Sequence, residues 1–344
     1  MPDLKACLAA AAADGHLSSE ARDAMSSRLD ELTGEFAASG RLSFIESQAR
    51  AASRLQGEIE RELSRKSRTR HMQALATDRI RQRFAAHPDA ADKVALGVLD
   101  IDPTMKFGGE NVSMTAQALR STAFSMMNDF VEAHRSKAGG FTRDKHGLPD
   151  VIRGLFGEAT TPEANALADG IIASRDFLRG AGNAAGMDII QRKNWGWVQH
   201  WDRSAVADVT KDQWRDFILP RLGNMLDHDG APMSARRVRE TVEASYDSIV
   251  VGDLQEVAGG FDKRFTSPVN SRIAHRELQF ADSKSWLEAQ KQFGNGDTFG
   301  AIIGETDRLA RDVALVQVLG PYPRATLESM KQLVDLGRVK AGKV

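Results

Sequence analysis

The stretch from Ser43 to Ala86 places the strongest constraint on what this chain can fold into. It contains no proline, and Gly57 is its only glycine. Apolar residues recur along it every three or four positions, which puts them on one face of an α-helix. Those residues are Ile45, Ala49, Ala52, Leu55, Ile59 and Leu63, followed after a gap by Met72, Leu75, Ile80 and Phe84. The pattern predicts one helix over about residues 43–86, about 60 Å long, with a break near Ser67 as the alternative.

The rest of the chain also favours helices. A helix of that length must pack in a coiled coil or bundle, or protrude. Alanine is abundant in the 344 residues, and Val, Ile and Thr runs typical of strands are almost absent. We therefore expect an all-α protein, an elongated multi-helix bundle with one long N-terminal helix and an irregular tryptophan-rich connection. Ala138-Gly139-Gly140 marks the expected boundary between an N-terminal helical region, 1–138, and a C-terminal helical domain, 139–344.

Composition excludes several classes of protein. The only cysteine, Cys7, rules out an intramolecular disulfide framework and a cysteine-rich metal site. The formal net charge of −1 gives the whole chain no strong field toward DNA or membranes. The longest apolar stretch, 8–13, falls far short of the roughly 20 residues of a transmembrane helix. The N-terminus also lacks the basic and hydrophobic regions of a secretory signal, so we expect no stable transmembrane segment.

The second half of the long helix is basic. Residues 61–83 hold eight lysines and arginines against Glu62 and Asp78. We interpret this as a solvated or partner-facing helix surface, because no aromatic residue is interleaved for base stacking. The alternative is contact with nucleic acid or another anion. The candidate contact residues are Arg61, Arg65, Lys66, Arg68 and Arg70.

Tryptophans are concentrated in the segment 187–202, which is the part of the chain with the strongest extended character. Trp195, Trp197 and Trp201 fall within seven residues there, and Trp286 lies on a later short helix. We interpret all four as packing anchors that hold irregular chain against a helical core. The alternative is a recognition surface, such as a platform on which a glycan stacks.

No reaction centre is apparent in the sequence. Zinc-protease spacing, a P-loop, a nucleophile elbow and a cysteine–histidine pair are all missing. The nearest groups of metal-ligand type are 200–202 and 227–229, but adjacent residues seldom face one metal. The glycine-rich stretch 180–186 follows a helix instead of a strand, so we expect a helix C-terminal turn and not a dinucleotide loop. We predict no catalytic, cofactor-binding or metal-binding residue, and no enzymatic activity.

The stretch 275–323 is the most regularly patterned part of the chain. Asp282 or Ser283 can cap a short helix that carries Trp286. Asn295-Gly296 is a turn dipeptide, and Asp297 is placed to cap the next helix. Gly320-Pro321 ends that helix. We therefore expect this segment to build architecture.

Four pieces of this segment carry a family resemblance: 280–286, 293–297, Arg311-Asp312 and 319–321. Together they resemble a pattern in large virion-associated proteins of tailed bacteriophages and prophages, and the connection 195–203 is similar to one upstream of it. The resemblance spans about residues 185–325. It implies a non-enzymatic internal or ejection component that oligomerises near the portal or tail and assists genome delivery.

The resemblance also implies partners and a location. The partners would be further copies of the chain, other virion proteins and DNA. The protein would be made in the host cytoplasm, reside in the virion and reach the host envelope on infection. Family members often carry a separate lytic domain, which this chain does not show, and no catalytic residue can be carried over. The alternatives are an enzyme acting on cell-wall glycan and a nucleic-acid-binding helical module.

Overall fold

A computed structural model describes residues 4–15, 17–38, 43–101, 106–107, 109–134, 147–189, 199–226, 230, 232–251 and 278–340. These residues form 14 α-helices and two short 3₁₀ helices. Their only strand-like pairings are three isolated β-bridges. The expectation of an all-α protein is therefore confirmed. The chain divides into two compact units, 1–68 and 69–344. This division falls inside the long helix, and the predicted boundary at 138–139 lies outside the described residues.

The first unit contains α1 (Leu4–Ala13), α2 (Ser19–Ala38) and the start of α3 (Phe44–Ala86). Its small core is made by four buried residues of α2 and α3: Leu29, Leu32, Ala51 and Leu55. Beside this core, Arg28 of α2 donates to Glu58 of α3 at 3.1 Å, and Arg54 of α3 donates to the same carboxylate at 3.1 Å. Burial opposes the charge on Arg28, but its hydrogen bonds to Glu58 and Glu31 outweigh this effect and raise its pKa.

The long helix α3 runs from Phe44 to Ala86 in one piece, as the apolar spacing predicts, and the alternative break near Ser67 is absent. Its start is set by a reciprocal cap. The Glu46 carboxylate accepts from the Ser43 backbone N–H at 2.8 Å, and the Ser43 hydroxyl accepts from the Glu46 N–H at 3.3 Å. The helix contributes residues up to 68 to the first unit and from 69 onward to the second.

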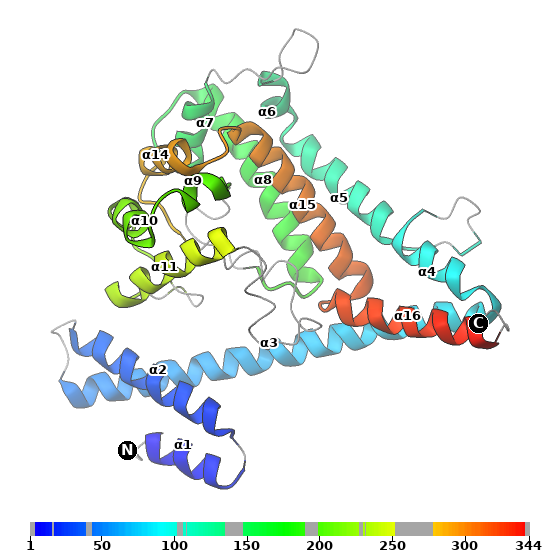
Figure 1. The fold of residues 1–344 in the computed structure, drawn as a ribbon, viewed down its shortest axis with the longest axis horizontal. Coiled ribbons are helices and arrows are strands. Elements are labelled where there is room, and N and C mark those ends of the chain that lie inside the picture. The colour runs from blue at the N-terminus through cyan, green and yellow to red at the C-terminus, as the bar shows by residue number, and fades with distance from the viewer. Residues whose placement is uncertain are drawn as a thin grey trace. The chain divides into compact units, whose positions relative to one another are not determined.

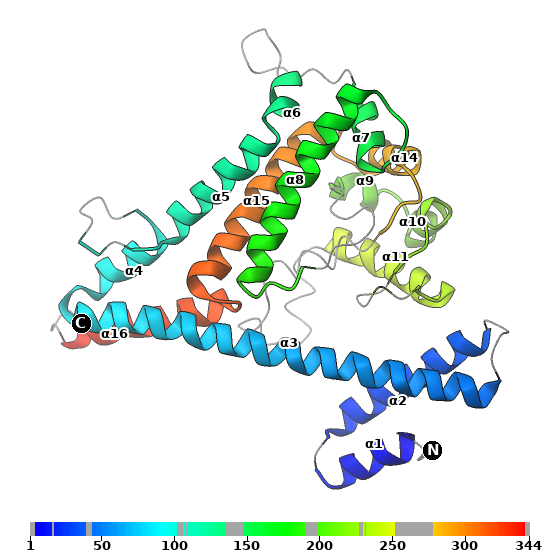
Figure 2. The same cartoon turned by 180° about the vertical axis from the view of Figure 1, so that it is seen from behind.

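Three long helices run side by side in the second unit (Figures 1 and 2). They are α5 (Val112–Met126), α8 (Pro162–Ala184) and α15 (Thr298–Leu319). Each begins at a side-chain cap: Asn111 accepts from the Met114 N–H at 2.7 Å, Thr161 from Ala164 at 3.1 Å, and Asp297 from Gly300 at 2.9 Å. Helices from both sides of position 138 thus share one packed body.

At the C-terminal end of α15, a second cluster joins three further helical segments. Here the last part of α3 meets α4 (Ala91–Leu99) and α16 (Pro323–Lys340), with the 3₁₀ helix η1 (Pro88–Ala90) between α3 and α4. The buried residues are Ile80, Phe84, Val94, Val98, Val318, Leu319 and Met330.

Seven further elements complete the second unit. They are α6 (Asn128–Ala133), α7 (Leu148–Leu155), α9 (Arg203–Ala207), α10 (Lys211–Ile218), η2 (Leu219–Arg221), α11 (Ala235–Val251) and α14 (Ser283–Phe293). Trp214 of α10 is completely buried, and its ring lies 5.0 Å from that of Phe293 on α14 and 6.5 Å from that of Tyr246 on α11. Its indole N–H lies 3.2 Å from the Val242 carbonyl and 3.3 Å from the Ser245 hydroxyl, both on α11.

Candidate functional site

The predicted basic contact residues all lie on α3. Arg61, Lys66, Arg68 and Arg70 have exposed side chains, and Arg65 is half-buried. The helix separates them into two groups. Arg61, Arg65 and Arg68 follow one another at i, i+4 and i+7 and therefore lie on one face. Lys66 and Arg70, at i and i+4, lie on a different face of the same helix.

Two further arginines extend the first group toward the N-terminus. Arg50 and Arg54 precede Arg61 by eleven and seven residues, a spacing that returns to the same side of a helix. The set Arg50, Arg54, Arg61, Arg65 and Arg68 is called the arginine stripe below, and all of it belongs to the first unit. The prediction from the sequence missed Arg50 and Arg54 because it counted charge only from residue 61. The helical spacing was the signal that would have found them.

Acidic residues beside the stripe neutralise part of it. The Glu62 carboxylate forms ion pairs with Arg65 at 2.5 Å and with Lys66 at 3.3 Å. Partial burial opposes ionisation of Glu62, but the hydrogen bonds and charges of Arg65 and Lys66 outweigh it, so its pKa is lowered. Glu58 holds Arg54 in the same way. Arg54 and Arg65 are therefore paired and partly buried, whereas the side chains of Arg50, Arg61 and Arg68 are exposed.

Two of the four predicted anchor tryptophans lie within the described residues, and both pack into the protein. Trp286 on α14 is 2% exposed. Trp201 is half-buried, with its ring 5.0 Å from that of Trp214 in an edge-to-face arrangement, and its backbone pairs with Gly294. Trp195 and Trp197 lie outside the described residues.

The residues considered as metal-ligand clusters have other roles where they are described. Asp202 caps α9 by accepting from the backbone N–H groups of Ser204 at 2.9 Å and Ala205 at 3.3 Å. His200 contacts the guanidinium of Arg308 through Nε2. The group 227–229 lies outside the described residues. In the part of the chain that is described, no three His, Cys, Asp or Glu side chains gather in a way that could hold a metal ion.

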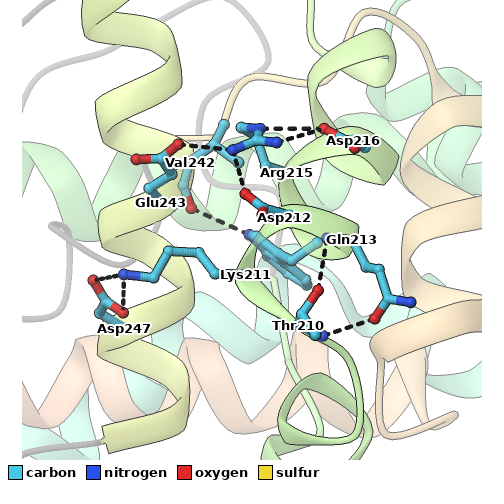
Figure 3. A network of polar contacts seen from close by, with 10 residues as sticks. Thr210, Lys211, Asp212, Gln213, Arg215, Asp216, Val242, Glu243 and Asp247 are labelled. Atoms are coloured by element: carbon cyan, nitrogen blue, oxygen red, sulfur yellow. Dashed lines mark hydrogen bonds and ion pairs between the residues drawn. The ribbon is translucent and has the colours of Figure 1, made fainter.

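A polar network that the sequence did not indicate joins α10 to α11 (Figure 3). Thr210 and Gln213 form a capping box at the start of α10. Lys211 pairs with Asp247 at 2.6 Å, and Arg215 bridges Asp212 at 2.5 Å and Glu243 at 3.3 Å. The hydrogen bond that Lys211 donates to Asp247 is the largest factor that raises the pKa of Lys211. All these side chains are satisfied by one another, so we interpret the network as a tie between two helices.

A second unexpected polar residue, Gln73, holds the junction between α15 and α16. Its side-chain NH₂ donates to the Leu319 carbonyl at 3.3 Å and to the Thr326 hydroxyl at 2.7 Å. Its side-chain oxygen accepts from the Tyr322 backbone N–H at 2.7 Å. Gly320 turns the chain here with φ of +89°, and a Cβ at this position would come within 2.7 Å of that same oxygen.

Comparisons with protein-family models, curated proteins and solved structures found no match to this chain. Among the described helices, none combines the length and apolar character needed to cross a membrane. The arginine stripe and the roles of the patterned residues 278–323 are therefore the features from which we infer function.

Proposed function

We propose that this chain is a non-enzymatic structural protein of a tailed-phage particle, an internal or ejection component that forms a homo-oligomer near the portal or tail and assists genome delivery. The observation that carries the proposal is the structural role of the patterned residues in which the phage resemblance lies. Where they are described, they cap, pack and join helices. This is the behaviour expected of residues that build a structural protein.

Individual contacts support this interpretation. Asp282 caps α14 through the Ser285 N–H at 2.7 Å, and Asn295 accepts from the Asp297 N–H at 3.2 Å in the turn before α15. Trp286 and Phe293 are buried in the core of the second unit. On α15, Asp307 pairs with Arg311 at 3.0 Å and with Arg120 of α5 at 3.1 Å.

The positions of Trp201 and Trp286, the two candidate tryptophans that the structure describes, favour a structural role over the glycan-binding alternative. A sugar-stacking platform needs exposed ring faces, whereas Trp286 is buried and Trp201 packs against Trp214 and Phe280. Zymography on cell-wall material with the purified chain separates the two proposals. We expect no cleared band. A cleared band that disappears only when the chain is denatured would favour the enzyme.

Self-association is supported by apolar side chains left exposed on adjoining helices of the second unit. Leu336 and Val339 of α16 are 59% and 62% exposed, and Leu96 of α4 is 55% exposed. Helix α4 packs against both α16 and α5, and Met114 of α5 is 48% exposed. Large apolar side chains left exposed on neighbouring helices are typical of an interface with another protein.

Mass spectrometry of purified particles tests the proposed location. Particles would be banded from a lysate of the strain that encodes the chain, and tryptic peptides would be assigned. We expect peptides of this chain together with portal and tail proteins, retained after nuclease and high-salt washes. Particles that yield portal and tail peptides but none from this chain would refute the proposal.

A further inference from the structure

We propose that the arginine stripe of α3 binds the phosphate backbone of double-stranded DNA without sequence preference. This inference goes beyond the proposed function and holds whether or not the chain resides in a particle. It rests on the geometry of the first unit: five arginines that lie along one side of a single continuous helix.

The stripe is uniform in its chemistry. With about 100° per residue, its five members fall within a band about 60° wide along the helix. Between residues 50 and 68, every position in that band is an arginine, and no acidic residue lies within it. At 1.5 Å per residue the band is about 27 Å long. This length corresponds to about eight base pairs along the axis of duplex DNA.

Neighbouring acids reduce the charge of the stripe but leave it positive. Glu46 lies beside Arg50, Glu58 is shared by Arg54 and Arg28, and Glu62 by Arg65 and Lys66. The Arg61 side chain lies back over Gly57, where an added Cβ would be 3.7 Å from its Nη1. A side chain in place of Gly57 would contact this guanidinium, so the glycine leaves it room along the helix.

Three features favour a DNA backbone over other anionic partners. The planar guanidinium can bind a phosphate through two parallel hydrogen bonds, which a lysine ammonium does not do. The band carries no asparagine, glutamine or aromatic residue that would read or stack on bases, so the expected contacts are to phosphates. It also carries no apolar side chain to insert into lipid: the exposed Ile45 and Leu63 lie on the opposite side of α3.

Binding must come from this local surface and not from the molecule as a whole. The formal net charge of the chain is −1, so long-range attraction to DNA is negligible. Each phosphate contact releases counterions, and the logarithm of affinity falls with the logarithm of salt concentration by about 0.9 per contact. The salt slope therefore counts the arginines that touch phosphates.

The experiment measures fluorescence anisotropy of a labelled mixed-sequence DNA duplex against the full chain, at several salt concentrations. The test variant is Arg50→Gln/Arg61→Gln/Arg68→Gln, which replaces the exposed members of the stripe and keeps the partly buried Arg54 and Arg65. We expect its salt slope to fall by about 2 to 3 and its affinity at about 0.1 M salt to fall by about 10-fold or more. Affinity of the parent chain should be equal for duplexes of different sequence.

A matched control removes the same charge elsewhere. Arg22→Gln/Arg153→Gln/Arg236→Gln replaces three exposed arginines on α2, α7 and α11. It should leave the slope and affinity unchanged, and circular dichroism should show equal helix content for both triple variants. The inference fails if the parent chain does not bind the duplex, or if the two triple variants lose affinity equally. Stripe-dependent binding to vesicles containing phosphatidylglycerol without binding to DNA would overturn it in favour of a membrane surface.

Discussion

Gln73 illustrates how one polar side chain determines the direction of a distant part of the chain. It lies on α3, and its amide group contacts backbone or hydroxyl groups at Leu319, Tyr322 and Thr326. Helix α15 ends there at Leu319, and α16 begins four residues later, at Pro323. The donors and acceptors of this junction would lose their partners if the side chain were removed, and buried polar groups without partners are costly.

Replacement of Gln73 by leucine should destabilise the second unit. The substitution keeps most of the side-chain volume but removes three long-range hydrogen bonds, so we expect a loss of about 1 to 3 kcal/mol in the free energy of unfolding. Urea denaturation followed by circular dichroism measures this. Gln82→Leu is the matched control, because Gln82 bonds only to exposed Asp78 on the same helix. Equal losses in both variants would contradict the role of Gln73.

The Asp282 cap should make α14 sensitive to acid. Hydrogen bonds from the Ser285 backbone N–H and then its hydroxyl lower the pKa of Asp282 in the folded state. A depressed pKa stabilises the fold above the unfolded-state value, about 3.9. That stability is lost as pH falls through the lower folded-state value. Asp282→Ala should therefore cost about 1 kcal/mol at neutral pH, and the difference from the parent should shrink below about pH 4.

The same denaturation series over pH provides the check. Asp282→Asn keeps an acceptor for the Ser285 N–H, so it should retain most of the stability at neutral pH while losing the acid-dependent part. A difference between Asp282→Ala and the parent that stays constant from neutral pH to about pH 3 would show that the charge of Asp282 contributes nothing.

Single residues with local roles were predictable from the sequence. The caps at Asp282 and Asp297 follow from residue type and position, and the structure confirms both. The roles of Gln73 and Trp214 were not predictable, because their partners lie far away in the chain and only the fold brings them together. The place of Arg50 in the arginine stripe could have been predicted from helical spacing alone. Counting charges along the sequence does not reveal it, because acidic residues lie nearby.

Among the elements, α3 was the most predictable because a long, regular apolar period without proline leaves few alternatives. The stretch 180–186 forms the end of a helix, as predicted. Helix α8 ends at Ala184 within it, and Gly186 turns the chain with φ of +96°. Gly182 lies so close to Met187, Ile189 and Val313 that an added Cβ would come within 2.7 Å of the Met187 sulfur. This close packing was not predictable from the sequence.

The attachment of α10 to α11 can be tested by two identical substitutions. Trp214→Phe removes the indole hydrogen bonds to α11, and we expect a loss of about 2 to 4 kcal/mol. Trp286→Phe removes the same volume from a site of similar burial, but among the described residues its indole N–H has no hydrogen-bond partner. Its loss should be smaller by about 1 kcal/mol or more. Urea denaturation of both variants decides, and equal losses would mean that the indole bonds to α11 add nothing.

At the scale of the whole molecule, the order in which helices pack was not predictable. Helix α15 returns to pack beside α5 and α8, which end more than a hundred residues earlier in the chain. Apolar periodicity shows which face of a helix is buried but not which partner covers it. The division into units therefore had to come from the structure, and it falls within α3, far from the glycine-rich segment at 138–140.

Self-association should depend on the exposed apolar residues of α16. We expect native mass spectrometry of the purified chain to give a defined multiple of 37.6 kDa. Leu336→Ser/Val339→Ser should shift the distribution toward the monomer by removing apolar contact area. Met126→Ser, which removes a 41% exposed methionine from α5, is the control and should not shift it. A parent chain that stays monomeric at all concentrations would contradict the proposed homo-oligomer.

The copy number of this chain in purified particles tests the structural proposal most directly. Isotope-labelled peptide standards for this chain and for the portal protein would be measured in several independent particle preparations. A component assembled near the portal should give one fixed, small ratio of copies to portal subunits in every preparation. A ratio that varies between preparations, or falls to zero as purity rises, would contradict a place for this protein in the particle.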